Sequence, residues 1–335
     1  MGQTTNHSLP LTPAMIMQAR KRLEGVALHT PLEPSPNLSS ISGASVSVKW
    51  ECLQRTGVFK LRGAYNKAAS LPPETAGPGV VTASSGNHGL AVAYAAKQLD
   101  FPATVVIPEE ASQLKMNKIK QYGATVLQHG ANYDIAAAHS VEFAKKTGAT
   151  LIHAYADPLV IAGQGTVGYE ILEDCPETNV VVVPIGGGGL ISGISFWVNT
   201  VNPNIRIVGV QTTATRAFYE NFKAKRLFHV PIEPTIADGL AGNTEQVNLD
   251  FGLQYVDDVV LVEESGLRQA IRWTLENERR VLEPAGVVGI AALLEKKIQL
   301  DTDENVVIVA SGSNIDINLL RSIMQTSLNA EETIH

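Results

Sequence analysis

Four short segments rich in Gly, Ser and Asn follow apolar runs, and they hold the residues best suited to chemistry. The strongest is Gly186–Gly189, four consecutive glycines between a valine-rich run and an expected helix. Consecutive glycines let the backbone approach an anion, and a helix start adds the positive end of its dipole. The spacing fits neither a dinucleotide fingerprint nor a P-loop. It predicts a site for a single phosphate monoester, with a plain strand-to-helix turn as the alternative.

The second segment also lies between an apolar run and an expected helix. Its polar residues are Ser84, Ser85, Gly86, Asn87 and His88. Small hydroxyls, an amide and backbone N–H groups gathered at a helix start suit a carboxylate. Ordinary helix capping is the alternative interpretation, because Ser and Asn are preferred at helix N-termini for their own sake.

The third segment places Lys60 between Phe59 and Leu61. Such a lysine is usually a surface cation with a buried stem. In apolar surroundings, however, its pKa falls and the neutral amine becomes a nucleophile suited to Schiff-base chemistry. The fourth segment, 311–314, has the sequence Ser-Gly-Ser-Asn and is by itself also consistent with a helix cap.

The elements that must position these segments alternate between apolar strand-like runs and amphipathic helical stretches, which predicts parallel sheet with crossover helices. The expected strands are 46–50, 80–83, 104–107, 125–127, 180–185, 206–211, 259–262 and 306–310. The expected helices include 13–23, 88–99, 112–122, 133–146, 163–173, 266–280 and 285–297. The continuous β-branched runs 180–183 and 306–309 predict central strands covered on both faces. Ligand sites of such sheets lie at the carboxyl ends of strands, where these segments are found.

Composition excludes several classes of function. The 335 residues are 44% hydrophobic and 18% charged, and the net charge of −7 comes without a long charged run, so no nucleic-acid or membrane-surface partner is expected. No apolar run is long enough to span a membrane, and the first residues lack a secretory signal, which predicts a cytoplasmic location. Cys52 and Cys175 belong to no cluster, so neither a disulfide framework nor a zinc site is predicted.

In this order, the segments Phe-Lys-Leu-Arg-Gly-Ala, Ser-Ser-Gly-Asn-His-Gly, Gly-Gly-Gly-Gly and Ser-Gly-Ser-Asn resemble the fold-type II pyridoxal-phosphate enzymes. The most similar group is that of the threonine/serine dehydratases and serine racemases, and the resemblance runs from about residue 12 to 323. It implies an α/β, tryptophan synthase beta-like architecture with two lobes, each a mainly parallel sheet flanked by helices. Residues 1–77 and 156–335 would form the large cofactor-binding domain, and 78–155 a small mobile domain. A homodimer is also implied.

The resemblance assigns a role to each matching residue. Lys60 would bind pyridoxal 5'-phosphate as an imine and later act as the general base. For the cofactor it implies Phe59 beside the ring, Asn87 at the phenolic oxygen, Ser311 at the pyridine nitrogen, and Gly186, Gly187, Gly188, Gly189 and the N–H of Leu190 around the phosphate. For the substrate carboxylate it implies Ser84, Ser85, Gly86, Asn87 and His88, with Glu283 lining the pocket near the group that is eliminated.

The activity implied is β-elimination of a β-hydroxy amino acid such as L-threonine or L-serine, which yields a 2-oxo acid and ammonia. Ser85 matches a serine that acts opposite the lysine in racemases, so serine racemization stays an alternative, as does 3-hydroxyaspartate dehydration. A silent pyridoxal-phosphate-binding protein is the non-enzyme alternative. A nicotinamide oxidoreductase is disfavoured because the glycine spacing and the acidic ribose ligand are missing.

Three departures from the pattern of the resembled family involve four positions. Val58 replaces the usual Ser before the Phe-Lys pair. Tyr155 stands where racemases have an amide and degradative dehydratases an aromatic residue, which favours dehydration. Gln211 and Ala217 stand where many relatives use a Glu and an Asp to bind a divalent cation, so no metal site is predicted.

Overall fold

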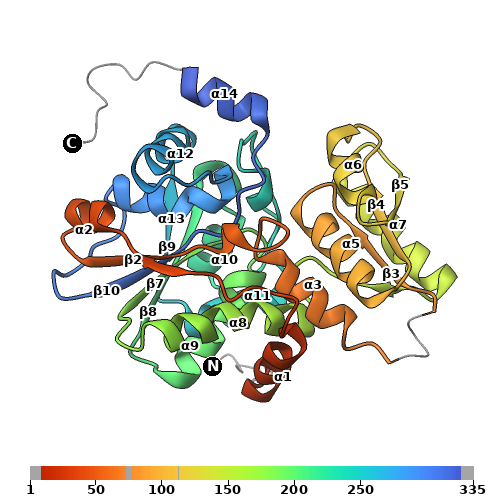
Figure 1. Ribbon diagram of the computed structural model, residues 1–335, viewed down its shortest axis with the longest axis horizontal. Helices are drawn as coiled ribbons and strands as arrows, with labels where there is room; N and C mark the ends of the chain where they lie inside the picture. Colours follow the sequence, from red (N-terminus) through yellow and green to blue (C-terminus); the bar gives the residue numbers. More distant parts are fainter. Residues whose placement is uncertain (1–8, 73–76, 112, 326–335) are drawn as a thin grey trace.

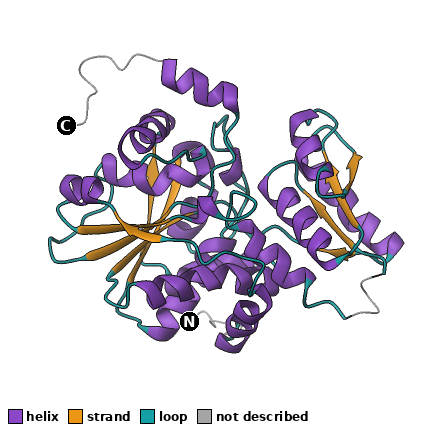
Figure 2. Ribbon diagram, viewed as in Figure 1, coloured by secondary structure: helices purple, strands orange, loops and turns teal. Residues whose placement is uncertain are grey.

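Two separate sheets, one entirely and one mainly parallel, organise the chain (Figures 1 and 2). The structure is a computed structural model and describes residues 9–72, 77–111 and 113–325. The larger sheet pairs β1 with β2 antiparallel and all its other neighbours parallel. Its order is β1 (Leu32–Pro34), β2 (Ser45–Lys49), β10 (Asn305–Val309), β7 (Val180–Pro184), β8 (Arg206–Thr212) and β9 (Asp258–Val262).

The central strands β7 and β10 are buried on both faces, as their continuous β-branched runs predicted. Alternate residues point to opposite sides of the sheet. Val180 and Val182 belong to the same core as helices α2 (Pro36–Ser42), α12 (Glu264–Glu278) and α13 (Pro284–Leu294). Val181 and Val183 pack on the other side, against α8 (Pro158–Asp174), α9 (Gly189–Val201) and α10 (Ala217–Ala224).

The smaller sheet is entirely parallel, in the order β5 (Thr125–Gln128), β4 (Ala103–Ile107), β3 (Val80–Ala83) and β6 (Thr150–Leu151). The helices of this lobe are α5 (Asn87–Leu99), α6 (Gln113–Lys120) and α7 (Tyr133–Thr147). The inner face of α5 is built from alanines, including Ala91, Ala95 and Ala96, which lie in one core with residues of β3 and β4. Small side chains let this helix pack closely between the sheet and its neighbours.

Helix α3 (Lys60–Ala68) lies between the two lobes (Figure 1). Its residues Leu61 and Ala64 share a core with α5 of the smaller lobe and with Val160 of α8. On the α8 side the backbones approach so closely that a Cβ on Gly163 would lie 2.5 Å from the carbonyl oxygen of Arg62. The packing leaves no room for any other residue there, so α3 is held firmly in place.

The remaining helices surround the larger lobe. α1 (Pro13–Leu23) packs against α8, α11 (Gln246–Tyr255) against α9, and α14 (Ile317–Gln325) ends the described chain. Three single 3₁₀ turns are η1 (Glu51–Leu53), η2 (Thr213–Thr215) and η3 (Asp238–Leu240). No helix among residues 9–72, 77–111 and 113–325 is long and apolar enough to cross a membrane.

All eight predicted strands are present within one residue at either end, and the predicted α/β class with two mainly parallel sheets is confirmed. The prediction that the helix before β7 starts at residue 163 was wrong, because it starts at Pro158. Asp157 caps it by accepting hydrogen bonds from the N–H groups of Leu159 and Val160, and proline suits the first helical position. The short strands β1 and β6 were not predicted.

The proposed domain limits at residues 77 and 155 stay a prediction. All four strands of the smaller sheet fall within 80–151. Residues 73–76, just before the first of these limits, lie outside the described residues, as do residues 326–335.

Candidate active site

Three of the four chemistry-bearing segments follow the carboxyl ends of β3, β7 and β10, as expected for open parallel sheets. The fourth, which holds Lys60, is joined to the segment after β10 by backbone pairing. Val58 forms an antiparallel bridge with Gly312, and the Phe59 N–H donates to the Ser311 carbonyl oxygen at 3.1 Å. This pairing, which the sequence did not predict, places Lys60 close to the end of β10.

Lys60 is the first residue of α3, and its side chain is partly buried. Its Nζ donates to the carbonyl oxygen of Ala154 at 3.2 Å and lies 5.3 Å from the centre of the Phe59 ring. Burial lowers the pKa of the amine to about 8, although the charge of Glu283 opposes this shift. A substantial fraction of Lys60 is therefore neutral near physiological pH, which a nucleophilic amine requires.

The four glycines connect β7 to α9 in a turn that only glycine can form. Gly188 has a φ of +103°, in the left-handed region that favours glycine. A Cβ on Gly187 would lie 2.5 Å from the ring of Tyr155, and one on Gly189 would lie 2.8 Å from the backbone of Tyr155. No side chain caps the N-terminus of α9, so the first N–H groups of this 13-residue helix are available to an anion.

A second uncapped helix start follows β3. No side chain caps α5 at Gly86, and the Ser84 hydroxyl accepts a hydrogen bond from the Gly86 N–H at 3.2 Å. Ser84, Ser85 and Asn87 are all partly exposed. Hydroxyls and free N–H groups at a helix start suit a carboxylate.

The imidazole of His88 is buried and tied to the smaller sheet. Its Nε2 lies 3.0 Å from the carbonyl oxygen of Ile152, to which only a protonated ring nitrogen can donate. Burial, together with the positive charge of Lys60, lowers the pKa of His88 to about 3. The ring is therefore neutral, and only the backbone N–H of His88 is suited to hold a carboxylate.

A chain of polar side chains links the segments after β10 and β3 to α13. Asn314 Nδ2 donates to Asn87 Oδ1 at 2.9 Å, and Asn87 Nδ2 donates to Glu283 Oε1 at 2.8 Å. Burial raises the pKa of Glu283 to about 7, although the hydrogen bond from Asn87 favours the ionised form. Glu283 thus sits near Lys60 as a carboxyl group poised between its two protonation states.

Ser311, predicted to face the cofactor nitrogen, is buried at the end of β10. Its hydroxyl lies 3.5 Å from the carbonyl oxygen of Ala285, too long for a strong hydrogen bond. The hydroxyl therefore remains available to another acceptor or donor. It belongs to the same group of segments as Lys60 and Asn87, through the backbone contacts of Phe59 and the side chain of Asn314.

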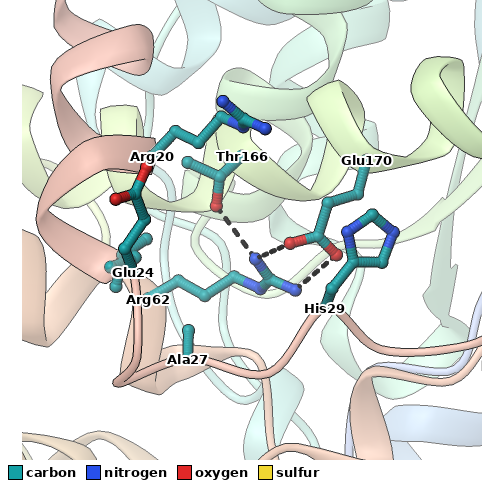
Figure 3. A pocket seen from close by; sticks show the side chains of 8 residues that line it. Arg20, Glu24, Ala27, His29, Arg62, Thr166 and Glu170 are labelled. Carbon is teal, nitrogen blue, oxygen red and sulfur yellow. Dashed lines mark hydrogen bonds and ion pairs between the residues drawn. The ribbon is translucent and has the colours of Figure 1, made fainter.

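Arg62 follows Lys60 by two residues in the first turn of α3. It belongs to a buried ion cluster formed by Lys49, Glu51, Arg62, Glu170 and Asp174. Its guanidinium contacts Glu51 Oε1 at 2.7 Å and Glu170 Oε1 at 2.6 Å, and it also donates to the Thr166 hydroxyl. Figure 3 shows the pairing with Glu170 and Thr166 beneath a pocket whose rim includes Arg20, Glu24 and His29. The carboxylates satisfy the guanidinium, so this cluster fixes α3 on α8.

The structure adds residues that the sequence did not single out. Asn314 was noted only as part of its segment, yet it orients Asn87. The Ala154 carbonyl and Asn248, whose Nδ2 donates to the Tyr155 carbonyl oxygen at 3.1 Å, belong to no motif considered. Asn314 could have been found from its place after a buried strand, but backbone carbonyls and contacts between distant residues leave no local signal.

Comparisons with known proteins define the class. The family described as "Pyridoxal-phosphate dependent enzyme" matches residues 24–312, and the chain belongs to this family. An L-threonine ammonia-lyase of Thermotoga maritima is 43% identical over 93% of this chain and 78% of its own length. L-threonine dehydratase catabolic TdcB of Staphylococcus aureus is 38% identical over 95% of this chain and 93% of its own. Maize serine racemase superposes with a TM-score of 0.90 at 34% identity, over 94% of this chain and 97% of its own.

The predicted family and the predicted cofactor are thereby confirmed, and the chain is a pyridoxal-phosphate-dependent enzyme. Its residues fit the cofactor on structural grounds as well. The amine of Lys60 has a lowered pKa, the glycine turn offers uncapped N–H groups to a phosphate, and the buried Ser311 hydroxyl has a weak partner. The individual role of each residue remains a prediction.

Proposed function

We propose that this protein converts L-threonine, and more slowly L-serine, to the corresponding 2-oxo acid and ammonia, by loss and later uptake of one water. The proposal depends on one observation. The amine of Lys60, whose pKa is lowered, lies close to the segments that follow the parallel strands β3, β7 and β10. The curated relatives named above are an L-threonine ammonia-lyase and an L-threonine dehydratase, which supports threonine as the substrate.

In this proposal the cofactor is held at four points. Lys60 binds its aldehyde, the N–H groups of Gly186–Gly189 and Leu190 bind its phosphate, and Asn87 and Ser311 contact its ring. When bound, pyridoxal phosphate supplies the electron sink that makes the α-proton of the amino acid acidic. A neutral hydroxyl at Ser311, in place of a carboxylate, would leave the ring nitrogen unprotonated and so favour rapid elimination over transamination.

The substrate carboxylate lies at the start of α5 in this proposal, on the hydroxyls of Ser84 and Ser85 and the free N–H groups. Lys60, released when the substrate binds, accepts the α-proton as general base. The β-hydroxyl departs with a proton as water, and in this proposal Glu283, whose pKa is about 7 and whose charge interacts with that of Lys60, shares in that proton transfer. Hydrolysis of the resulting enamine, through its imine form, consumes one water and releases ammonia and the 2-oxo acid.

The test uses purified protein reconstituted with pyridoxal phosphate. We expect a visible absorbance band that borohydride bleaches. The reduced cofactor should then be recovered covalently attached to the peptide that contains Lys60. A panel of L-threonine, L-serine and 3-hydroxyaspartate compared by kcat/KM should give the highest value for L-threonine. Failure to bind the cofactor, or absence of 2-oxo acid from every member of the panel, would refute the proposal.

Serine racemization is a second candidate activity, favoured by Ser85 and by the similarity to maize serine racemase. Ser85 lies in the segment that precedes α5, partly exposed toward solvent. Chiral analysis of the serine left unreacted separates the two activities, because dehydration alone leaves L-serine enantiomerically pure.

We further propose a cytoplasmic homodimer, on the strength of the family resemblance. Sedimentation equilibrium of the holoenzyme tests the dimer, and a mass equal to one chain would contradict it. Cell fractionation tests the location.

A further inference from the structure

Gln211 is a fully buried amide at the carboxyl end of β8, beside the glycine turn. Its Nε2 donates to the carbonyl oxygen of Ile185 at 3.3 Å, and its Oε1 accepts from the backbone N–H of Tyr219 at 2.8 Å. Ile185 is the residue directly before the first glycine, and Tyr219 lies in the first turn of α10. One side chain therefore joins the entrance of the turn to the start of a helix.

The second contact also reaches the glycine turn. No side chain caps α10 from Arg216, so the Tyr219 N–H obtains its partner from Gln211. The preceding residue, Phe218, is fully buried, and its ring lies 3.1 Å from the position that a Cβ on Gly188 would occupy. Gln211 thus supports the turn at Ile185 directly and at Gly188 through α10.

A divalent cation does not fit this place. Calcium and magnesium require oxygen ligands, and carboxylates above all. Here the amide directs an N–H toward Ile185, and Ala217, the other position where resembled relatives use an acid, has no ligand atom. Among the described residues, no group of three or more His, Cys, Asp or Glu is arranged to hold a metal ion.

We propose that Gln211 is a positioning residue that holds the glycine turn in its phosphate-binding shape with a neutral amide, in place of a metal ion. The inference rests on the proposed role of Gly186–Gly189 as the phosphate site. A carboxamide suits this task because it is donor and acceptor at once, and Ile185 and Tyr219 present one acceptor and one donor.

Replacing the amide by a carboxylate should create a dependence that the natural protein lacks. In Gln211→Glu, one carboxylate oxygen still accepts from Tyr219. The other faces the Ile185 carbonyl oxygen with no hydrogen between them, and a divalent cation bound to both oxygens would relieve this repulsion. Gln211→Met keeps the volume of the side chain but removes both of its hydrogen bonds. It also offers no ligand oxygen, so a cation cannot restore the affinity for the cofactor.

The experiment titrates pyridoxal phosphate into apoprotein and measures its dissociation constant, first in EDTA and then with millimolar MgCl₂ or CaCl₂. For the natural protein, the dissociation constant should not change when the cation is added. Gln211→Met should bind about tenfold more weakly under both conditions, because both hydrogen bonds that hold the turn are lost. Gln211→Glu should bind pyridoxal phosphate weakly in EDTA and regain affinity when a cation is added. The ³¹P resonance of the bound phosphate should be shifted in EDTA and return to its natural position with the cation.

Gln54→Met is the matched control, because Gln54 is also a buried amide hydrogen-bonded to the backbone, at the N–H and the carbonyl of Leu28 and at the N–H of Arg55. It should lower the urea midpoint of the apoprotein, while its affinity for the cofactor stays within about twofold, as expected for separate sites. If Gln211→Met does not fold, Gln211→Glu still decides the question through its response to cations.

Natural protein that loses cofactor affinity in EDTA, or Gln211 variants that in EDTA bind pyridoxal phosphate as well as the natural protein does, would overturn the inference while leaving the proposed function intact. Natural protein that binds no cofactor under any condition would overturn both.

Discussion

Lys60 and Arg62 are two residues apart in the first turn of α3, yet their surroundings oppose each other. The amine of Lys60 has a carbonyl oxygen as its hydrogen-bond partner, and burial lowers its pKa to about 8. Burial would also lower the pKa of Arg62, but Glu51 and Glu170 more than offset it and raise the pKa. Two cations in one turn of a helix thus have different roles. The paired one holds the helix in place, while the unpaired one is available for reaction.

The carboxylates near the two cations show the same contrast. Burial acts to raise the pKa of Glu51, but Arg62, together with Lys49 and the hydrogen bond from Thr30, more than offsets it and holds the pKa below its usual value. Among the described residues, no cationic side chain is hydrogen-bonded to Glu283. Burial therefore raises its pKa to about 7. Complete pairing makes a rigid support, whereas incomplete pairing keeps protons exchangeable.

The largest effect is expected when the reactive cation is removed. Lys60→Ala should lower kcat for 2-oxo acid formation by at least about 10³-fold, within the range of general-base catalysis. It should also abolish borohydride-stable cofactor attachment. Its urea midpoint should stay close to that of the natural protein, since no ion pair is lost. Lys223→Ala, which removes an exposed lysine paired with Asp258, is the control and should keep full activity. Normal turnover by Lys60→Ala would contradict the assignment.

The supporting cation should matter for stability instead. Arg62→Met leaves the buried Glu51 without its ion-pair partner and Glu170 with Lys49 alone, which should cost about 3–5 kcal/mol of unfolding free energy in urea. The control is Arg216→Met, which breaks an exposed pair with Glu233 and should cost no more than about 1 kcal/mol. Equal losses in the two variants would show that the ion cluster does not support α3.

The carboxyl group near Lys60 should produce a pH effect of intermediate size. Because the pKa of Glu283 is raised in the folded state, its stabilising contribution is complete below about pH 4.5 and is lost as the pH rises through about 7. The unfolding free energy of apo Glu283→Gln, measured relative to the natural apoprotein, should therefore increase by about 1–3 kcal/mol between pH 5 and 8. A difference that does not change with pH would contradict the raised pKa.

The smallest effect concerns Ser85, on the opposite lobe from the reactive amine. Ser85→Ala should abolish any formation of D-serine from L-serine and reduce threonine dehydration only by about tenfold, because the free N–H groups of α5 still bind the carboxylate. Chiral chromatography and a 2-oxo acid assay on the same sample measure both. Unchanged D-serine formation would exclude Ser85 as the second acid-base residue.

The expected strands were found because continuous β-branched runs have few alternatives in a soluble protein. The four glycines and the Ser84–His88 segment were predicted to be anion sites for a similar reason, since glycines and small polar residues at a helix start after a strand have a definite chemistry. These two roles stay predictions. Lys60 is different. The sequence shows a lysine between two apolar residues, which is consistent with a surface cation, and only the family resemblance favoured the reactive amine.

By itself the sequence determined the order of the elements, the places where the chain can approach an anion, and the membership in a family of pyridoxal-phosphate enzymes. Those properties depend on local composition and spacing. The tertiary structure alone decided which cation is paired, that Asn314 orients Asn87, and that Gln211 reaches Ile185. These contacts join residues 11 to 227 positions apart. Their electrostatic consequences depend on burial and distance, which exist only once the chain has folded.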